Sequence, residues 1–211
     1  MTRTVSLRCS CGTLRGHASD ISPAAQSRAV CYCDDCQIYA LHLGQAGVLD
    51  ERGGTDACML TPAQVTITQG SEQIRCIRLS PKGLYRWYAA CCNTPLGNTL
   101  SPRIPVLILV HSFMDHAAGG HSREEDVGRP TIRMMARFAK GGVPPGAHAK
   151  VPVSMMPRIA VHIARGLLAG KARPSPFFDA AGQPRATPTL MDKQERESLR
   201  ARVLSDAGLS A

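Results

Sequence analysis

The sequence predicts a mainly β, metal-binding domain followed by a helical extension. Three observations predict this fold class. Apolar segments of strand length alternate with glycine and proline turns over the first 110 residues, thiols cluster between those segments, and helical spacing of apolar residues appears mainly later in the chain. The chain has 211 residues, of which 44% are hydrophobic and 19% charged, a composition typical of a globular protein. We expect a β domain over residues 1–115 and a basic, largely helical extension over residues 116–211 that packs on it.

The first elements are a hairpin, a strand and a short helix. Residues 5–12 alternate as a strand does, Gly12 permits a turn, and residues 13–17 can run back as the second arm. Residues 28–31 form a strand that leads into the sequence Cys31-Tyr32-Cys33-Asp34-Asp35-Cys36. A tight turn through the two aspartates would then be followed by a helix over residues 37–43, which stops at Gly44.

Three further strands are expected to form an antiparallel meander, and a buried strand should follow them. The meander segments are residues 64–68, 75–79 and 84–88, and the buried strand is residues 105–111. The meander ends at a second thiol cluster, Cys91-Cys92. The cysteine-bearing segments therefore lie at strand ends, where a small sheet can gather them at one edge.

Helical signals characterise the extension. Residues 131–138 can form one or two helical turns, and residues 153–169 place apolar side chains at helical spacing. In residues 174–179, two phenylalanines should dock on the core. The last helix has Asp192 as its N-cap, Glu195 as the capping-box partner and Gly208 as its stop.

Charge and hydropathy limit the classes of protein. The formal net charge is +9, of which residues 1–100 carry +2 and residues 101–211 carry +7. The basic excess therefore belongs to the extension, and we interpret it as mainly a solvated surface. No apolar stretch is long enough to span a bilayer, and the N-terminus lacks a signal-peptide core, so we expect a cytoplasmic protein that does not bind a membrane. Nine cysteines, seven of them clustered, indicate metal binding rather than disulfides in that compartment.

The central cluster Cys31, Cys33 and Cys36 predicts a zinc site with a free coordination position. Three thiolates can hold zinc, and an open fourth position distinguishes a catalytic zinc from a structural one. The alternative is a closed structural site, completed by a residue such as His42 or Cys91. Without a motif around them, His17, His42, His111 and His121 are better explained as structural histidines.

A second site is predicted from Cys9 and Cys11 together with Cys91 and Cys92. Four thiols suit a structural zinc that ties the first hairpin to the meander. Adjacent residues of a strand point to opposite faces, so Cys91 and Cys92 can reach one metal only if the backbone turns there, and we favour Cys92. The separate thiols of Cys58 and Cys76 are expected to pack in the core.

The order C-x-C-G, C-x-C-x-x-C and R-x-x-x-x-C-C-N-T resembles the family of glutathione-dependent formaldehyde-activating enzyme (GFA) and centromere protein V, in particular an uncharacterised bacterial branch of it. The resemblance covers about the first 110 residues. It implies a GFA-like β-tent fold with two zincs. One would be structural, held by the thiols of Cys9, Cys11 and Cys92, and one would lie at Cys31, Cys33 and Cys36. The family motif C-x-x-C-G would place Ala89 at its first cysteine and Asn93 at its glycine. Two alternatives follow: Cys91 replaces that ligand, or the structural site is incomplete.

The leading functional hypothesis is a zinc-dependent carbon-sulfur lyase with Cys31, Cys33 and Cys36 at its catalytic site. The resemblance implies glutathione and formaldehyde, combined as S-hydroxymethylglutathione, as the substrate class, and another small thiol is the wider alternative. The rival is a non-catalytic, zinc-stabilised binding module with a basic surface. A thiol redox protein is a third option. Few aromatic residues and no Lys/Arg run argue against nucleic acid as a partner, and self-association into a homo-oligomer stays open.

Overall fold

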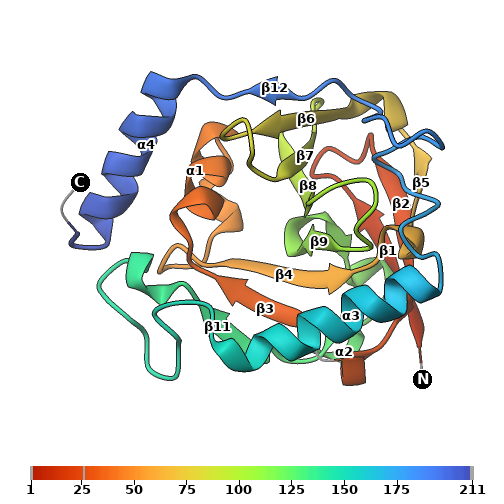
Figure 1. Cartoon of the computed structure of the whole chain (residues 1–211), viewed down its shortest axis with the longest axis horizontal. Coiled ribbons are helices and arrows are strands. Elements are labelled where there is room, and N and C mark those ends of the chain that lie inside the picture. The colour runs from red at the N-terminus through yellow and green to blue at the C-terminus, as the bar shows by residue number, and fades with distance from the viewer. Residues whose placement is uncertain (1, 26, 210–211) are drawn as a thin grey trace.

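The computed structural model describes residues 2–25 and 27–209 and is mainly β, as the sequence predicts (Figure 1). Two sheets hold twelve strands in the described residues, and four α-helices accompany them. The four-stranded sheet has the order β10-β1-β2-β5, and the eight-stranded sheet has the order β11-β3-β4-β9-β8-β7-β6-β12. All pairings are antiparallel except those of β11 with β3 and of β12 with β6.

The elements have the following bounds. The smaller sheet consists of β1 (Arg3–Arg8), β2 (Arg15–Ile21), β5 (Val65–Gln69) and β10 (Met114–Asp115). The larger sheet consists of β3 (Arg28–Cys31), β4 (Thr55–Leu60), β6 (Ile74–Arg78), β7 (Tyr85–Ala89), β8 (Thr94–Thr99), β9 (Leu107–Val110), β11 (Ile132–Met134) and β12 (Thr189–Leu190). The helices are α1 (Asp34–His42), α2 (Arg123–Val127), α3 (Met156–Leu168) and α4 (Lys193–Asp206). Within the described residues, no helix is long and apolar enough to cross a membrane.

The predicted first hairpin is confirmed as β1 and β2. Val5 and Leu7 alternate with exposed residues and are buried in the main core, and Gly12 turns the chain with a φ of 78°. In the second arm, a Cβ atom at Gly16 would lie only 2.2 Å from the carbonyl oxygen of Thr66. Glycine at this position therefore lets β2 approach β5 closely.

The expected meander of residues 64–68, 75–79 and 84–88 is wrong in its first strand. β5 pairs with β2 in the smaller sheet, whereas β6 and β7 pair with each other in the larger one. Gly70, with a φ of 73°, and a 3₁₀ turn over Ser71–Gln73 redirect the chain between the sheets. The alternation of residues 65–69 suits a strand in either sheet, so it could not specify the pairing partner.

Two other local expectations are met only in part. Residues 131–138 contain one helical turn, the 3₁₀ turn of Ala136–Phe138; before it, β11 pairs in parallel with β3, and Met135 has a φ of 58°. The open edge of β3 supplies backbone hydrogen bonds that outweigh the weak helix signal. The predicted turn through Asp34 and Asp35 is instead the first turn of α1, which begins three residues earlier than expected.

The later helices agree with the sequence. α3 occupies most of residues 153–169, and α4 begins after Asp192, whose carboxylate accepts a hydrogen bond from the Glu195 amide at 2.9 Å. The Glu195 side chain does not complete a capping box, because its carboxylate lies 2.7 Å from Nδ1 of His42. Phe177 and Phe178 dock on the core as expected, with ring centroids 4.8 Å and 5.5 Å from that of Trp87.

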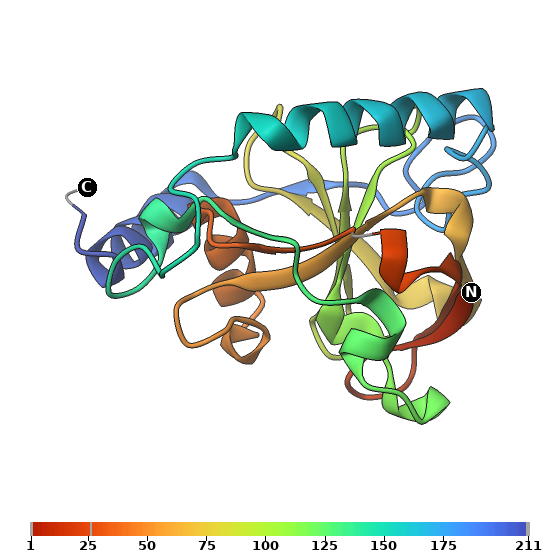
Figure 2. The same cartoon turned by 90° about the horizontal axis from the view of Figure 1, so that it is seen from below.

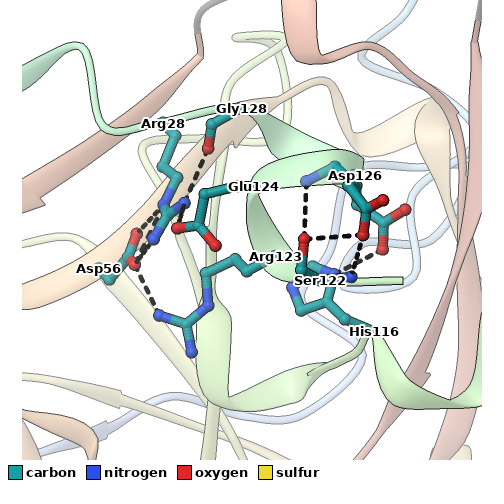
Figure 3. A network of polar contacts seen from close by, with 9 residues as sticks. Arg28, Asp56, His116, Ser122, Arg123, Glu124, Asp126 and Gly128 are labelled. Carbon is teal, nitrogen blue, oxygen red and sulfur yellow. Dashed lines mark hydrogen bonds and ion pairs between the residues drawn. The ribbon is translucent and has the colours of Figure 1, made fainter. Parts of the chain in front are cut away.

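A polar network connects the extension to the larger sheet (Figure 3). The buried guanidinium of Arg28 in β3 binds Asp56 at 2.7 Å, Glu124 at 2.8 Å and the carbonyl oxygen of Gly128 at 2.7 Å. Arg123 adds a second cation 2.8 Å from Asp56. Burial alone would raise the pKa of Asp56, but its hydrogen bonds and charge interactions with the two arginines hold that pKa below its usual value. The short helix α2 is thus anchored to β3 and β4.

Candidate metal centre

The three thiols of the central sequence motif converge at the end of β3 and the start of α1. The sulfur atoms of Cys31, Cys33 and Cys36 all lie within 4.8 Å of one another, and those of Cys33 and Cys36 are 2.9 Å apart. Sulfurs bound to one tetrahedral zinc stand about 3.8 Å apart, given Zn–S bonds of about 2.3 Å. A modest separation of Cys33 from Cys36 therefore admits a metal ion. We refer to this group as the three-thiol cluster.

The helix places its positive end at the three-thiol cluster. Cys33 is the N-cap of α1, and its sulfur accepts a hydrogen bond from the Cys36 amide at 3.3 Å. A helix N-terminus favours negative charge, including that of thiolates. The same backbone that shapes the motif therefore also favours metal-binding thiolates.

Arg86 adds a buried positive charge beside this cluster. It is 3% exposed, and its guanidinium carbon lies 5.3 Å from the centre of the Tyr39 ring. Hydrogen bonds from Cys31 and Cys33, followed by the charge of Arg86, hold the pKa of Cys36 well below its usual value despite burial. The sequence motif that contains Arg86 gave it no role, and its position in the middle of a strand offered no signal of one.

Three residues that line a small cavity next to Cys36 each carry a polar atom without a hydrogen-bond partner among the described residues. These atoms are Nη1 of Arg86, Oγ1 of Thr55 and Oδ1 of Asn98, and each is inaccessible to solvent. The cavity has a volume of about 10 Å³, close to the space needed for one water molecule. Buried polar groups without partners are costly, so this cavity suits an oxygen-bearing group that satisfies all three. Sequence reasoning did not single out Thr55 or Asn98.

The second site contains all four of the remaining predicted thiols. The sulfurs of Cys9, Cys11, Cys91 and Cys92 lie within 4.8 Å of one another. Cys11 is 3.3 Å from Cys91, Cys9 is 3.6 Å from Cys11, and both Cys9 and Cys92 are 3.8 Å from Cys91. These separations match the spacing of a tetrahedral tetrathiolate site. We refer to this group as the four-thiol cluster.

Cys91 and Cys92 can both reach this position because they lie in the tight turn between β7 and β8. Asn93 follows them with a φ of 56°, a left-handed conformation that asparagine tolerates. Because the chain turns at this point, both cysteines join the cluster, and the predicted preference for Cys92 over Cys91 as a ligand is not needed. Although burial opposes ionisation, hydrogen bonds from Ser10 and Thr94 lower the pKa of Cys92 to about 5.

The four-thiol cluster joins the two sheets. Cys9 and Cys11 lie in the turn of the β1–β2 hairpin in the smaller sheet, whereas Cys91 and Cys92 lie between strands of the larger one. The amide of Ser10 also donates a hydrogen bond to Oγ1 of Thr94 at 3.0 Å across the same junction. A metal held here would fasten one sheet to the other.

The residues proposed to close the three-thiol cluster lie elsewhere. Cys91 belongs to the four-thiol cluster, and Nδ1 of His42 pairs with Glu195. Among the described residues, no histidine, cysteine or carboxylate is positioned as a fourth ligand with Cys31, Cys33 and Cys36. Cys58 and Cys76 are buried in the core, as expected. The described residues therefore supply only three of the four ligands that a tetrahedral metal takes at this cluster.

The last helix borders this region with basic side chains. Arg200 lies 3.3 Å from Asp34, and Arg196 lies 3.6 Å from Asp35, so α4 pairs with the first turn of α1. Figure 1 shows α4 beside α1, on the side of the molecule away from β5. Part of the basic excess of the extension thus neutralises the two aspartates of the central motif.

Comparison with known proteins places the chain in a family. No curated protein matches the sequence. A family model matches residues 1–187, a range that includes both thiol clusters, Arg86 and the docked phenylalanines. The chain therefore belongs to a family of unknown function, DUF6151.

Proposed function

We propose that the protein binds zinc at both thiol clusters and uses the three-thiol cluster as a carbon-sulfur lyase acting on a small-thiol adduct. The main support is the geometry of the cluster: three thiols converge, and no fourth ligand comes from the described residues. A small cavity beside Cys36 is lined by residues whose polar atoms lack hydrogen-bond partners among the described residues. The resemblance of the cysteine motifs to those of the GFA family supports the same class of reaction.

The donor sets suit zinc in particular. Sulfur-only sites select soft or borderline metals, and the closed set of four thiols has the composition of a structural zinc site. Cys31, Cys33 and Cys36 would hold the second ion. Zinc bound there supplies a Lewis acid that favours the thiolate form of an incoming sulfur.

Arg86 balances the charge of this arrangement. Three thiolates around a divalent cation leave a net charge of −1, which one buried guanidinium offsets. The free Nη1 of Arg86 can donate a hydrogen bond to an oxygen atom in the small cavity. Asn98 Oδ1 can accept a hydrogen bond from a hydroxyl at the same place, and the Thr55 hydroxyl can donate one to it.

These groups fit a hydroxymethyl thioether, of which S-hydroxymethylglutathione is one example. In the cleavage direction, the carbon-sulfur bond breaks, the hydroxyl loses its proton as the carbonyl forms, and the sulfur leaves as a thiol after taking up one proton. The products are a free thiol and formaldehyde. In the reverse direction, Arg86 would polarise the carbonyl oxygen while the thiolate attacks its carbon.

Metal analysis and exchange NMR test this proposal together. We expect two zinc ions per chain and faster exchange between a thiol and its hydroxymethyl adduct than in buffer, with glutathione and formaldehyde as the first pair. Cys33→Ser should lose one zinc and the acceleration. Cys76→Ala, which removes a buried thiol outside both clusters, should keep both.

Two zinc ions bound without any acceleration, with either glutathione or simpler thiols, would refute the lyase assignment. That result would favour the alternative in which both ions are structural and the protein is a binding module.

A further inference from the structure

A second, larger cavity adjoins the three-thiol cluster from the direction of α3. Its volume is about 290 Å³, and its wall includes Cys31. Figure 2 shows α3 lying along one face of the molecule, across the strands beneath it. The helix therefore covers a chamber that reaches Cys31, one residue of the three-thiol cluster.

Aliphatic side chains from five segments line this chamber. They are Ala29 of β3, Ala57 and Met59 of β4, Val106 and Ile108 near β9, Ile132 and Met134 of β11, and Met155, Ile159 and Ile163 of α3 and the turn before it. Well-packed interiors hold few voids larger than a water molecule. An apolar chamber of this size is instead close to the range of small-molecule sites, and an apolar cavity of about 150 Å³ already accommodates benzene.

The charges near the chamber do not suit a zwitterionic peptide. No carboxylate of the described residues lines it. Two arginines line it. The guanidinium of Arg28 is engaged by Asp56, Glu124 and the Gly128 carbonyl, as Figure 3 shows, whereas Arg158 of α3 is exposed. The ammonium group of glutathione would meet no carboxylate in this lining, and its two carboxylates would compete for one exposed cation, Arg158, so most of this charge would lose its hydration without a matching partner.

We propose that this chamber binds the apolar body of the substrate, so that the preferred thiol or thiol adduct carries an aliphatic or aromatic group rather than a peptide. This inference rests on the proposed function for the reactive sulfur, whereas the chamber itself can be tested separately. The sulfur would lie at Cys31, Cys33 and Cys36, and the carbon chain would lie between α3 and the sheet.

Methyl NMR with two probes of equal chain length tests the proposal. 1-Hexanol reports binding to the chamber alone, and 1-hexanethiol adds a sulfur. On the zinc-loaded protein, both should shift the methyl signals of Met59, Ile108 and Ile159, and 1-hexanethiol should bind at least tenfold more tightly than 1-hexanol. Added glutathione at the same concentration should leave these signals unchanged.

Two variants on α3 locate the site. Ile159→Trp fills the chamber and should weaken 1-hexanol binding at least tenfold. Leu168→Trp places the same ring on the same helix at a side chain that is 91% exposed, and should bind as the wild type does. Ile163→Ala enlarges the chamber and should shift the preference from 1-hexanethiol towards 1-octanethiol, a gain that misfolding cannot produce.

The two proposals fail in different ways. Absence of any 1-hexanol shift in the chamber methyls, or equal effects of the Ile159 and Leu168 variants, would overturn the chamber proposal even if thiol exchange is accelerated. Specific 1-hexanol binding in a protein that accelerates no thiol exchange would uphold the chamber and overturn the lyase assignment.

Discussion

Arg86 is the residue whose environment most constrains the chemistry of the three-thiol cluster. A guanidinium that is 3% exposed is stable only if nearby negative charge compensates its loss of hydration. Asp35 lies 3.8 Å away and is itself half-exposed, so the thiolates supply much of that compensation. Metal binding, which keeps the three sulfurs ionised, and the burial of the Arg86 charge therefore support each other.

We predict that Arg86→Met weakens zinc binding at the three-thiol cluster by about 10–100-fold, the usual cost of losing a group that supports metal ligands. Arg86→Lys keeps the charge and should lose less. Competition with a coloured chelator measures both affinities. The four-thiol cluster provides the internal control, and a uniform loss of zinc from both sites would contradict a specific effect of Arg86.

Asp56 should make the protein sensitive to acid. Its pKa in the folded protein lies below the ordinary value of 3.8, so its contribution to the free energy of unfolding is complete above about pH 3.8. That contribution disappears as the pH falls through the lower, folded-state pKa. Asp56→Asn should therefore remove part of the acid-dependent loss of stability seen in urea titrations below pH 4.

At pH 7 the same variant should be destabilised by about 3–5 kcal/mol, because Arg28 loses a buried partner. Glu197→Gln is the matched control, since that carboxylate is 66% exposed and pairs only with Lys193 at 3.8 Å among the described residues. It should change the free energy of unfolding by less than about 1 kcal/mol. Equal effects of the two variants would show that the network of Figure 3 is not a specific stabilising element.

At the scale of elements, the close contact between β2 and β5 depends on Gly16, which has no side chain. Gly16→Ala would bring a Cβ atom against the Thr66 carbonyl oxygen, which is part of the backbone and has little freedom to move. We expect a loss of about 1–3 kcal/mol in thermal or urea unfolding. Gly47→Ala is the control, because nothing lies within 4 Å of its added carbon. Its unfolding free energy should stay within about 0.5 kcal/mol of the wild type.

The sequence predicts an element when the residues that determine it lie within the element itself. The β1–β2 hairpin and α4 carry their own signals, Gly12 in one and Asp192 with Gly208 in the other. β11 has no such signal, since Ile132 and Met134 become a strand only because the edge of β3 is open. The partner of β5 was equally invisible, because alternation defines a strand but not its neighbour.

The candidate metal site also combines parts that local sequence predicts with parts that only the folded sheet brings together. Cys31, Cys33 and Cys36 are close in sequence, so their convergence is a local property that spacing predicts. Thr55, Arg86 and Asn98 come from three different strands, and only the sheet brings them to one cavity. The choice of neighbouring strands, which alternation does not specify, therefore determines the polar half of the candidate site.

For the whole molecule, the four-thiol cluster should matter more to stability than the three-thiol cluster. Cys9 and Cys91 are 82 residues apart in sequence, and their metal would restrain a long loop of the unfolded chain. Cys11→Ser should therefore lower the melting temperature more than Cys33→Ser does. Calorimetry with parallel zinc analysis checks this order, and the reverse order would assign the structural role to the three-thiol cluster.

The two ends of the larger sheet are both completed late in the sequence. β11 covers β3 at one edge, and β12 covers β6 at the other. During synthesis, the ribosome releases β3 to β9 well before either covering strand, so the growing chain presents two unpaired strand edges at once. The short parallel strands of the extension thus protect both edges of the larger sheet from intermolecular β-pairing. The nascent chain remains prone to aggregation until residue 190 has left the ribosomal exit tunnel.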